Sequence, residues 1–425
     1  MNVKISPSNF NGTQVAPASK SSMQRACAAA LLHNGKTLIH NAGISNDDKA
    51  AQDIVKQLGA FITENENYVE INSVGFGKNT LAENKTINCG ESGLSIRMFS
   101  PIAALSAQTI NIIGEGSLQK RPMDFFDEIF PQLNIKINST AGKLPIQVTG
   151  PLQAKEITID GSLSSQFLTG LLFAFGEAAT EAVCINVIDL KSKPYIDLTL
   201  SVMNHFGYKI EHQNHEKFII NPKENLQNKT IEYIVEGDWS SASFLLVAAA
   251  IAGSIRLTGL NVHSTQADKA IMEVLKLAGA SIKIGGKNIE INKTELQAFE
   301  FDATDCPDLF PPIAALASYC KGTSIIKGTH RLAAKESDRA KTIQDVFGKM
   351  GIQIILENDV MKIVGGQINA ASVSSHHDHR IAMAAAVAAL RATGSIEISD
   401  AEAINKSYPQ FYEDLKKLGA AVEIL

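Results

Sequence analysis

Six short polar clusters along this chain carry residue types that suit the binding of anions. Each cluster directly precedes an apolar, alanine-rich run that predicts a helix. The clusters are residues 19–22 with Arg25, 91–93 with Arg97, 162–166, 238–241, 305–308 and 376–380. Backbone N–H groups at a helix N-terminus, together with a Lys or Arg, make a good anion site. The pattern therefore predicts a substrate that carries several negative charges.

Helix capping is the simpler interpretation of the same clusters. Ser and Asp are favoured N-cap residues, worth about 1 kcal/mol each, and capping alone explains the cluster that begins at Asp238. It does not explain the cations, because a positive charge near a helix N-terminus opposes the helix dipole. These cations are Lys20, Arg25, Arg97 and Arg380.

Further charged residues lie between the predicted helices, in segments 120–122, 335–339 and 406–409. Any one of them is explained by a solvated surface charge, but together they strengthen the prediction of a polyanionic substrate. The carboxylates Asp308 and Glu336 interrupt this cationic set. A carboxylate disfavours anion binding, so a role in proton transfer is the more attractive hypothesis.

Other motifs do not support a known chemistry. The run 376–379 contains three His and one Asp, but adjacent side chains alternate in direction and do not converge on a metal. Residues 35–37 resemble the end of a P-loop, yet Ala30 occupies the position of its first Gly. No Ser-His-Asp or Cys-His pairing can be argued from the sequence.

The elements that must position these clusters repeat about every seventy residues. The alanine-rich run starts near Ser21, Gly93, Leu163, Trp239, Asp308 and Asp378, with spacings of 72, 70, 76, 69 and 70. A second, amphipathic helix recurs in each repeat, and five of its six copies end in Gly, the usual left-handed stop. These are Gly59, Gly207, Gly279, Gly351 and Gly419. Six such units cover the chain, so the repeat is the fold.

Length and composition narrow the class of protein. A chain of 425 residues is too long for one core, and six repeats divide into three and three. We therefore expect an α/β fold of two similar lobes with buried parallel helices, divided near the turn at residues 236–238. The net charge of −5 argues against a nucleic-acid binder. The five dispersed cysteines indicate reduced thiols. No signal peptide or membrane-spanning segment is visible, so we expect a cytoplasmic protein that does not associate with a membrane.

Several segments carry a resemblance to a known family. They are residues 19–26 (SKSSMQRA), 161–172 (GSLSSQFLTGLL), 191–200 (KSKPYIDLTL), 335–340 (KESDRA), 378–383 (DHRIAM) and 405–411 (NKSYPQF). In order and spacing the chain resembles the 3-phosphoshikimate 1-carboxyvinyltransferases, or EPSP synthases, of the enolpyruvyl transferase family. The resemblance implies two lobes, each of three βαβαββ repeats, with the active site in the cleft between them. One lobe would comprise residues 20–234 and the other 1–19 with 235–425.

The resemblance also implies a reaction and a role for individual residues. Phosphoenolpyruvate would be joined to the 5-hydroxyl of shikimate 3-phosphate, with Lys20, Asp308 and Glu336 as catalytic residues. The residues implied to bind shikimate 3-phosphate are Lys20, Ser21, Arg25, Ser164, Ser165, Gln166, Ser192, Tyr195, Asp308 and Lys335. Those implied to bind phosphoenolpyruvate are Lys20, Gly93, Arg97, Arg121, Gln166, Arg339, Arg380 and Lys406. The family implies no cofactor, no metal and a monomer.

The chain departs from the commonest family pattern beside the implied phosphoenolpyruvate pocket. The usual Asn-Ala-Gly-Thr run is Glu-Ser-Gly-Leu at 91–94, and the Pro that often follows the Arg is Met98. Glyphosate competes for this pocket in the family, so we expect it to bind more weakly here. Arg331 stands where the family often has Asn or Leu, and Ala333 stands where it often has Arg, so we expect the detailed contacts to shikimate 3-phosphate to differ here.

Two other functions are compatible with parts of this pattern. UDP-N-acetylglucosamine 1-carboxyvinyltransferases share the fold, but many carry a Cys in the loop that corresponds to residues 114–123, and this loop has neither Cys nor Asp before its Arg-Pro pair. A non-catalytic repeat scaffold is the alternative from another class. The presence of the whole set of catalytic and cationic residues argues against a scaffold.

Overall fold

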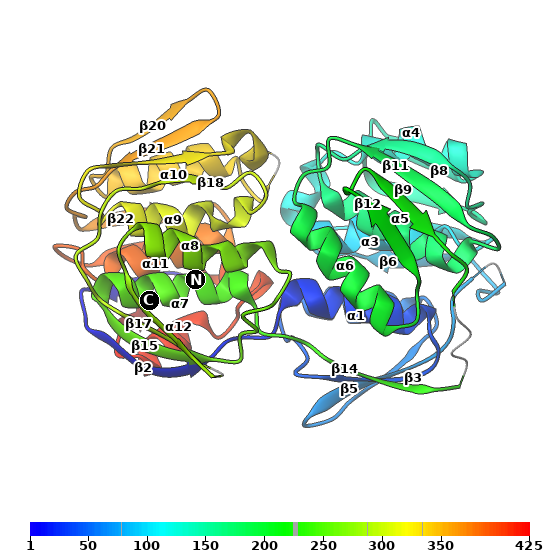
Figure 1. The fold of residues 1–425 in the computed structure, drawn as a ribbon, viewed down its shortest axis with the longest axis horizontal. Coiled ribbons are helices and arrows are strands. Elements are labelled where there is room, and N and C mark those ends of the chain that lie inside the picture. Colours follow the sequence, from blue (N-terminus) through cyan, green and yellow to red (C-terminus); the bar gives the residue numbers. More distant parts are fainter. Residues whose placement is uncertain (78, 224–227, 287, 334) are drawn as a thin grey trace. The chain divides into compact units, whose positions relative to one another are not determined.

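The computed structural model describes residues 1–77, 79–223, 228–286, 288–333 and 335–425. The chain divides into two compact units (Figure 1). Unit 1 comprises Met1–Pro17 and Glu236–Leu425, and unit 2 comprises Ala18–Val235. Each unit has its own sheets and its own buried helices, and each is described by itself below.

The described residues form six four-stranded sheets, three in each unit, and all six share one pattern. Two neighbouring strands are parallel, and the second of them pairs antiparallel with one strand of an antiparallel pair. The result is the six-repeat α/β fold that the sequence predicts. In five sheets the antiparallel pair is a hairpin of two consecutive strands, and in the sixth sheet it is formed by the first and last strands of the chain.

In unit 2 the three sheets have the strand orders β14-β3-β5-β4, β6-β7-β9-β8 and β10-β11-β13-β12. Their bounds are β3 Asn34–His40, β4 Phe61–Glu64, β5 Tyr68–Val74, β6 Lys85–Asn88, β7 Thr109–Ile113, β8 Lys136–Thr140, β9 Lys143–Thr149, β10 Ile157–Asp160, β11 Val183–Ile188, β12 Ile210–Gln213, β13 Lys217–Ile220 and β14 Thr230–Ile234.

In unit 1 the strand orders are β16-β17-β15-β2, β18-β19-β21-β20 and β22-β23-β1-β24. The bounds are β1 Val3–Ser6, β2 Phe10–Val15, β15 Gly253–Thr258, β16 Ser281–Gly285, β17 Asn288–Asn292, β18 Glu300–Asp302, β19 Thr323–Lys327, β20 Ile354–Glu357, β21 Val360–Val364, β22 Ala371–Ser374, β23 Ile396–Ser399 and β24 Ala421–Ile424.

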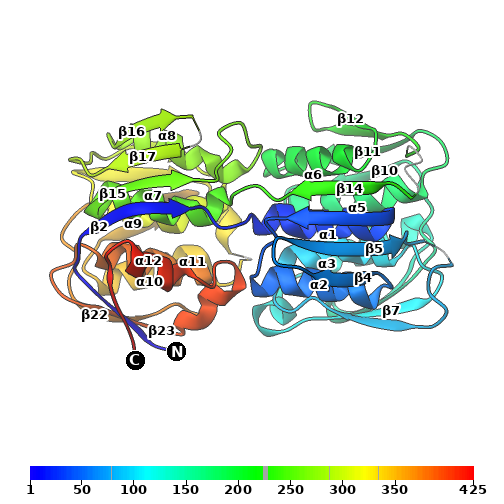
Figure 2. The ribbon, with the colours of Figure 1, turned by 90° about the horizontal axis from the view of Figure 1, so that it is seen from below.

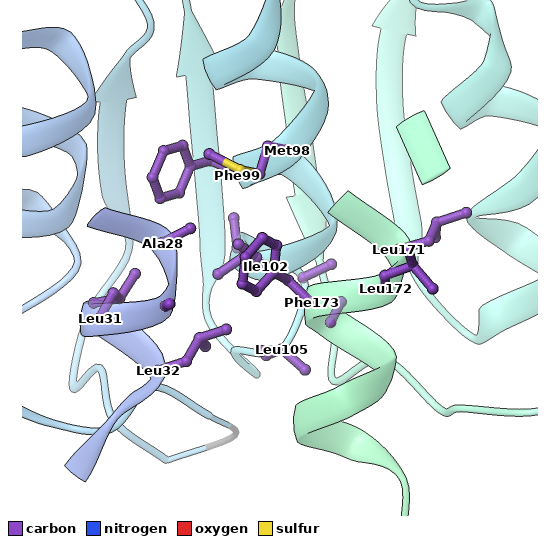
Figure 3. Close-up of a cluster of buried hydrophobic side chains, with 14 of the residues drawn as sticks. Ala28, Leu31, Leu32, Met98, Phe99, Ile102, Leu105, Leu171, Leu172 and Phe173 are labelled. Atoms are coloured by element: carbon purple, nitrogen blue, oxygen red, sulfur yellow. The ribbon is translucent and has the colours of Figure 1, made fainter. Parts of the chain in front are cut away.

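The alanine-rich runs form the buried helices of each unit. Unit 2 contains α1 Lys20–Leu32, α3 Gly93–Ala103 and α5 Ser165–Ala178, and unit 1 contains α7 Trp239–Ala252, α9 Phe310–Ala317 and α11 His379–Ala389. Every residue of α7 is buried, as expected for a helix that is apolar on all faces. Figure 3 shows side chains of α1, α3 and α5 packed together in unit 2, including Leu31, Phe99 and Phe173.

A glycine allows two of these helices to approach closely. A Cβ atom at Gly170 of α5 would lie 2.4 Å from the backbone oxygen of Arg97 and 2.9 Å from the Cα of Met98, both in α3. The backbones of α3 and α5 are therefore in direct contact, and any larger residue at position 170 would push them apart. This contact fixes the position of Arg97 beside α5.

The second helix of each repeat is amphipathic, with both buried and exposed residues along its length. These helices are α2 Asn46–Gln57, α4 Asp124–Ile129, α6 Lys193–His205, α8 Ile271–Leu277, α10 Arg339–Lys349 and α12 Phe411–Lys417. The five predicted glycine stops all have positive φ, between 80° and 104°. In the remaining repeat, the second along the chain, Asn134 takes the place of the glycine, with φ of 61°. Asn also tolerates the left-handed region. Short 3₁₀ helices occupy Gly116–Lys120, Pro131–Leu133, Ala267–Ala270, Pro307–Leu309, Thr329–Leu332 and Ala401–Lys406.

Two strands are exchanged between equivalent sheets. Strand β2 leads along the chain into α1 of unit 2, yet it pairs parallel with β15 of unit 1. Strand β14 leads into α7 of unit 1, yet it pairs parallel with β3 of unit 2. Figure 2 shows β2 beside β15, and β14 beside the sheet of β5 and β4. The N-terminal strand β1 lies between β23 and β24, so both ends of the chain belong to one sheet.

Two sequence predictions about the chain's surroundings can be compared with this fold. All five cysteines are free thiols, four of them buried, in agreement with the prediction of reduced cysteines. Among the described residues, no helix has the length and apolar character needed to cross a membrane.

Candidate active site

The first turns of the buried helices in unit 2 gather at one end of the unit. Ser19, Ser92 and Ser164 cap α1, α3 and α5, each accepting a backbone N–H from its own helix. The hydroxyls of Ser92 and Ser95 both donate to Oε1 of Gln24 in α1, at 2.9 Å. The helices are therefore parallel, and their partial positive ends point the same way.

Lys20 is the first residue of α1, and its ammonium group lies at this end. Its Nζ is 2.8 Å from Oδ2 of Asp47, which stands in the first turn of α2. Asp47 is almost fully buried, whereas Lys20 keeps 15% of its side chain exposed. The ion pair holds the ammonium group near the surface of the unit, where a ligand can reach it.

Arg25 lies one turn further along α1, and its guanidinium is buried among neutral acceptors. It donates from Nε to Oγ1 of Thr199 at 2.8 Å, from Nη1 to the backbone oxygen of Ser21 at 2.8 Å and from Nη2 to that of Tyr195 at 3.3 Å. Burial lowers the pKa of Arg25 to about 10, so the group remains charged at neutral pH. Neutral oxygens leave its positive charge available to attract an anion.

Two more guanidinium groups converge at the start of α3. A Cβ atom at Gly93 would lie 2.5 Å from Nη1 of Arg121 and 3.0 Å from Nη1 of Arg97. Arg97 also donates to Oε1 of Gln166 at 2.9 Å and lies over the ring of Phe167, 5.1 Å from its centre. Gly93 is therefore required for the close approach of two cations, an arrangement that suits an anion with more than one charge.

The remaining predicted residues of unit 2 surround these cations. Ser165 and Ser192 are buried, and Ser192 has a left-handed backbone immediately before α6. Its carbonyl accepts the N–H of Tyr195 at 3.1 Å. Through the bond from Arg25 to the Tyr195 carbonyl, the start of α6 is tied to α1.

In unit 1 the first turns of α7, α9 and α11 also gather. Asp238 caps α7 by accepting the N–H groups of Ser240 and Ser241, which confirms the capping prediction. Arg380, in the first turn of α11, donates to the Ser240 hydroxyl of α7 and to Oδ2 of Asp308 just before α9. One guanidinium therefore links the N-terminal ends of all three helices.

Arg339 is the centre of a second charge network in unit 1. Its side chain is 0% exposed and donates to three carboxylates. Nη1 lies 2.7 Å from Asp308, Nη2 lies 2.6 Å from Glu336, and Nε lies 3.0 Å from Asp378. Lys335 approaches Asp308 at 3.3 Å, and Lys406 approaches Glu336 at 3.5 Å. Both predicted catalytic carboxylates are thus held by the same guanidinium.

The surroundings of Asp308 fix its charge. Burial raises the pKa of this carboxyl, but Arg380, Lys335 and Arg339 together outweigh burial and hold the pKa well below its usual value. Burial lowers the pKa of Lys335, which Asp308 partly offsets. Asp308 is therefore ionised at neutral pH and can accept a hydrogen bond from a hydroxyl.

The predicted residues form one cluster in each unit. Unit 2 holds Lys20, Ser21, Arg25, Gly93, Arg97, Arg121, Ser164, Ser165, Gln166, Ser192 and Tyr195. Unit 1 holds Asp308, Lys335, Glu336, Arg339, Arg380 and Lys406. The interpretation of the inter-repeat cations as surface charges is wrong for Arg121, Arg339 and Lys406, because all three are buried.

Three residues with clear structural roles escaped the sequence interpretation. Asp47 holds Lys20, Thr199 holds Arg25, and Asp378 holds Arg339. Asp378, in the run 376–379, caps α11 and pairs with Arg339. The position of Asp378 directly before a predicted helix indicates the N-cap role, but not the pairing with Arg339.

Solved structures identify the class of protein to which this fold belongs. An EPSP synthase from Acinetobacter baumannii matches with a TM-score of 0.81 and 26% identity, covering 100% of both chains. The enolpyruvyl transferase NikO from Streptomyces tendae matches with a TM-score of 0.77 and 16% identity, covering 99% of this chain and 98% of NikO. The chain has the enolpyruvyl transferase fold.

Sequence comparisons narrow this class to one family. The family model of EPSP synthase (3-phosphoshikimate 1-carboxyvinyltransferase) matches residues 5–415. The 3-phosphoshikimate 1-carboxyvinyltransferases of Clostridium novyi (strain NT) and Clostridium botulinum (strain Alaska E43) are 36% and 37% identical, covering 99% and 98% of this chain and 98% and 97% of their own. The chain belongs to the EPSP synthase family, as its resemblance predicts, and is a transferase of the shikimate pathway to aromatic amino acids.

Proposed function

We propose that the two clusters act on one pair of substrates, phosphoenolpyruvate and shikimate 3-phosphate. The enolpyruvyl group is transferred to the 5-hydroxyl of shikimate 3-phosphate, and phosphate is released. The observation that supports this assignment best is the contrast between many buried cations and two carboxylates that share one guanidinium, Arg339. Both substrates are phosphorylated carboxylates, so cations bind them while the carboxylates move protons.

The reaction is an addition followed by an elimination. A proton is added to the methylene carbon of phosphoenolpyruvate, and the 5-hydroxyl attacks the neighbouring carbon and loses its own proton. The resulting ketal phosphate then loses phosphate and a methyl proton, which restores the enol. We assign the hydroxyl proton to Asp308 and the methylene proton to Glu336, with Lys20 in contact with both substrates.

The ionised state of Asp308 supports its half of this assignment. Three cations hold its pKa low, so it enters the reaction as a carboxylate able to accept a hydrogen bond from the 5-hydroxyl. Glu336 is 11% exposed and lies between Arg339 and Lys406. Protonation of carbon by Glu336 thus occurs beside two cations that also neutralise the departing phosphate.

The substrates are assigned to the predicted residue sets. Arg25, Ser165, Ser192, Tyr195 and their neighbours hold shikimate 3-phosphate, because Arg25 presents a charge that neutral oxygens position without cancelling it. The convergent pair Arg97 and Arg121 at Gly93 holds phosphoenolpyruvate. We further assign residues 20–234 and residues 1–19 with 235–425 as the two lobes, and the protein as a cytoplasmic monomer that needs no cofactor.

The deciding experiment measures phosphate release from phosphoenolpyruvate by the purified protein. Release with shikimate 3-phosphate, and none with UDP-N-acetylglucosamine, is the expected result. Lys20→Met abolishes turnover, whereas Lys56→Met, at an exposed lysine of α2, serves as the matched control and leaves it unchanged. Release only with the nucleotide sugar would overturn the substrate assignment, and release with neither would overturn the activity.

A second experiment separates the two carboxylates. Glu336→Gln is expected to suppress exchange of solvent deuterium into the methylene group of phosphoenolpyruvate. In Asp308→Asn, exchange is expected to fall by a smaller factor than turnover does. Equal loss of exchange in both variants would contradict the division of roles. The variants keep the volume of each side chain, so differences report protonation rather than packing.

A further inference from the structure

A cluster of two histidines and an aspartate lies in unit 2 on elements that the reaction does not use. Asp197 stands on α6, His212 on β12 and His215 in the turn between β12 and β13. One potential ligand atom from each residue lies within 4.8 Å of the other two. Within the described ranges this is the only group of three His, Cys, Asp or Glu residues that meets such a spacing.

The three side chains already contact one another. Nε2 of His215 lies 2.7 Å from Oδ1 of Asp197. The His215 backbone N–H donates to Nδ1 of His212 at 3.2 Å, and the two rings are tilted with their centres 4.1 Å apart. Asp197 is half-buried, with 36% of its side chain exposed, so an ion from solvent can reach the group.

The turn that carries His215 has two residues with a left-handed backbone. Asn214 and His215 both have positive φ, 52° and 60°, and they form the two central residues of a tight hairpin between Gln213 and Glu216. Such a turn favours Asn-Gly, because the second position is also left-handed. A residue with a Cβ costs roughly 1 kcal/mol or more there. At this position the ring of His215 contacts Asp197.

We propose that Asp197, His212 and His215 bind a divalent transition metal, with Zn²⁺ as the preferred ion. Imidazole nitrogen and carboxylate oxygen are ordinary zinc ligands at about 2.0–2.2 Å, and such ligand sets also accept Co²⁺ and Ni²⁺. Water completes the coordination. The site joins α6 to the β12–β13 hairpin and stabilises that end of unit 2.

Coordination requires two small rearrangements. Ligand atoms of a tetrahedral zinc lie roughly 3.4 Å apart, as follows from the bond lengths above. Nε2 of His215 and Oδ1 of Asp197, which lie 2.7 Å apart, must therefore separate slightly, while the His212 ring rotates toward them and gives up the bond that its Nδ1 accepts from the His215 N–H. His215 must coordinate through Nε2, and the proton of its neutral ring then lies on Nδ1. Both changes take place in side chains at the surface of the hairpin.

The test is metal binding to tag-free protein that has been treated with a chelator. Cys184 is the one cysteine that is not buried, and it lies on β11 of the same sheet, so the measurements use a Cys184→Ser background. Calorimetric titration with Zn²⁺ is expected to give one site per chain. Co²⁺ is expected to give the visible absorption of nitrogen and oxygen ligands without a thiolate charge-transfer band.

Two variants decide whether the cluster is the site. His212→Ala and Asp197→Asn are each expected to weaken binding by about tenfold or more, and zinc is expected to raise the melting temperature of the parent protein but not of the variants. His263→Ala, an exposed histidine of unit 1, is the control and leaves binding unchanged. Absence of saturable binding, or binding that both variants retain at full strength, would overturn the proposal.

Discussion

Two aspartates, one in each unit, have opposite electrostatic surroundings: Asp48 is buried, and Asp308 keeps 23% of its side chain exposed. Burial raises the pKa of both Asp48 in unit 2 and Asp308 in unit 1. For Asp308 the cations Arg380, Lys335 and Arg339 outweigh burial, and the pKa falls well below its usual value. For Asp48 the hydrogen bonds from Ser45 and the charge of Lys20 are too weak to outweigh burial, and the pKa rises to about 6.

The same difference runs through the cations of the two units. Arg339 in unit 1 donates to three carboxylates, whereas Arg25 in unit 2 donates to a hydroxyl and two backbone carbonyls. The cations of unit 1 keep neighbouring carboxylates such as Asp308 ionised, so that these carboxylates can accept hydrogen bonds and orient a hydroxyl. A buried cation without a balancing anion attracts one, which suits substrate binding.

Replacing each aspartate by its neutral isostere gives the largest expected effect. Asp308→Asn is expected to lower kcat by about 10²–10⁴-fold, because the base that accepts the hydroxyl proton is lost. Asp48→Asn is expected to keep kcat within about tenfold of the parent value. The Asp48 carboxylate accepts hydrogen bonds from Ser45, whereas Lys20 pairs with the neighbouring Asp47. Steady-state kinetics at saturating substrates measure both, and an equal collapse in the two variants would contradict the comparison.

The charge network can be tested through stability. Asp378 is fully buried and pairs with Arg339, so Asp378→Asn is expected to lower the free energy of unfolding by about 3–5 kcal/mol. Thr199→Val removes a neutral acceptor from Arg25, and its expected cost is smaller, about 1.5–3 kcal/mol. Urea titrations of both variants check this order, and a larger loss from Thr199→Val would overturn it.

The pH dependence of stability should have opposite signs at the two aspartates. With a pKa near 3.9 unfolded and about 6 folded, Asp48 contributes stability that is complete below about pH 4 and is lost as the pH rises through 6. Two pKa units amount to about 3 kcal/mol. Asp308 has a lowered folded pKa, so its contribution is present at neutral pH and is lost on acidification.

The measurement compares Asp48→Asn with the parent protein by thermal or urea unfolding between pH 4 and pH 7. The stability of the variant relative to the parent is expected to improve by about 3 kcal/mol over this range. Asp53→Asn, at an exposed position of the same helix, is the control and should show no such trend. A flat difference for Asp48→Asn would show that its carboxyl titrates normally.

The buried helices and their caps could be predicted because their signals are local. The run at 239–252 is apolar on every face, and Asp238 stands where an N-cap is needed. The pair of Glu336 and Arg339 is also visible as an i,i+3 spacing. The pair of Arg339 and Asp378 joins residues 39 positions apart, and nothing in either local sequence indicates it.

Other features depend on tertiary context that overrides the local pattern. Asp47 and Asp48 follow Ser45 at the start of an amphipathic helix, a pattern typical of solvent-exposed charges in a first turn. Both are buried because the preceding loop folds over them, and a Cβ atom at Gly43 would lie 2.2 Å from the Asp48 carboxylate. The exchange of β2 and β14 has no signal in the local pattern, since equivalent strands of a repeat have the same pattern and either can pair in either sheet. The resemblance alone predicts it, because it assigns residues 1–19 and 20–234 to different lobes.

The smallest expected effect concerns the anion pocket of unit 2 at α3. Leu94 follows Gly93, where Arg97 and Arg121 converge, and is 7% exposed, whereas Met98 is fully buried beside Gly170 of α5. Leu94 therefore influences the pocket more directly than Met98. Because the family often has Thr at this position, Leu94→Thr is expected to tighten glyphosate inhibition by up to about tenfold, or 1.4 kcal/mol.

Inhibition constants against phosphoenolpyruvate measure this effect in the parent, in Leu94→Thr and in a double variant that adds Met98→Pro. Proline at 98 removes an N–H from the interior of α3, which costs about 3 kcal/mol of helix stability, so the single variant isolates the pocket from the helix. Equal inhibition of the parent and both variants would show that α3 does not set inhibitor affinity. Tighter inhibition of the double variant alone would show that the path of α3, rather than the Leu94 side chain, positions Arg97 for the anion.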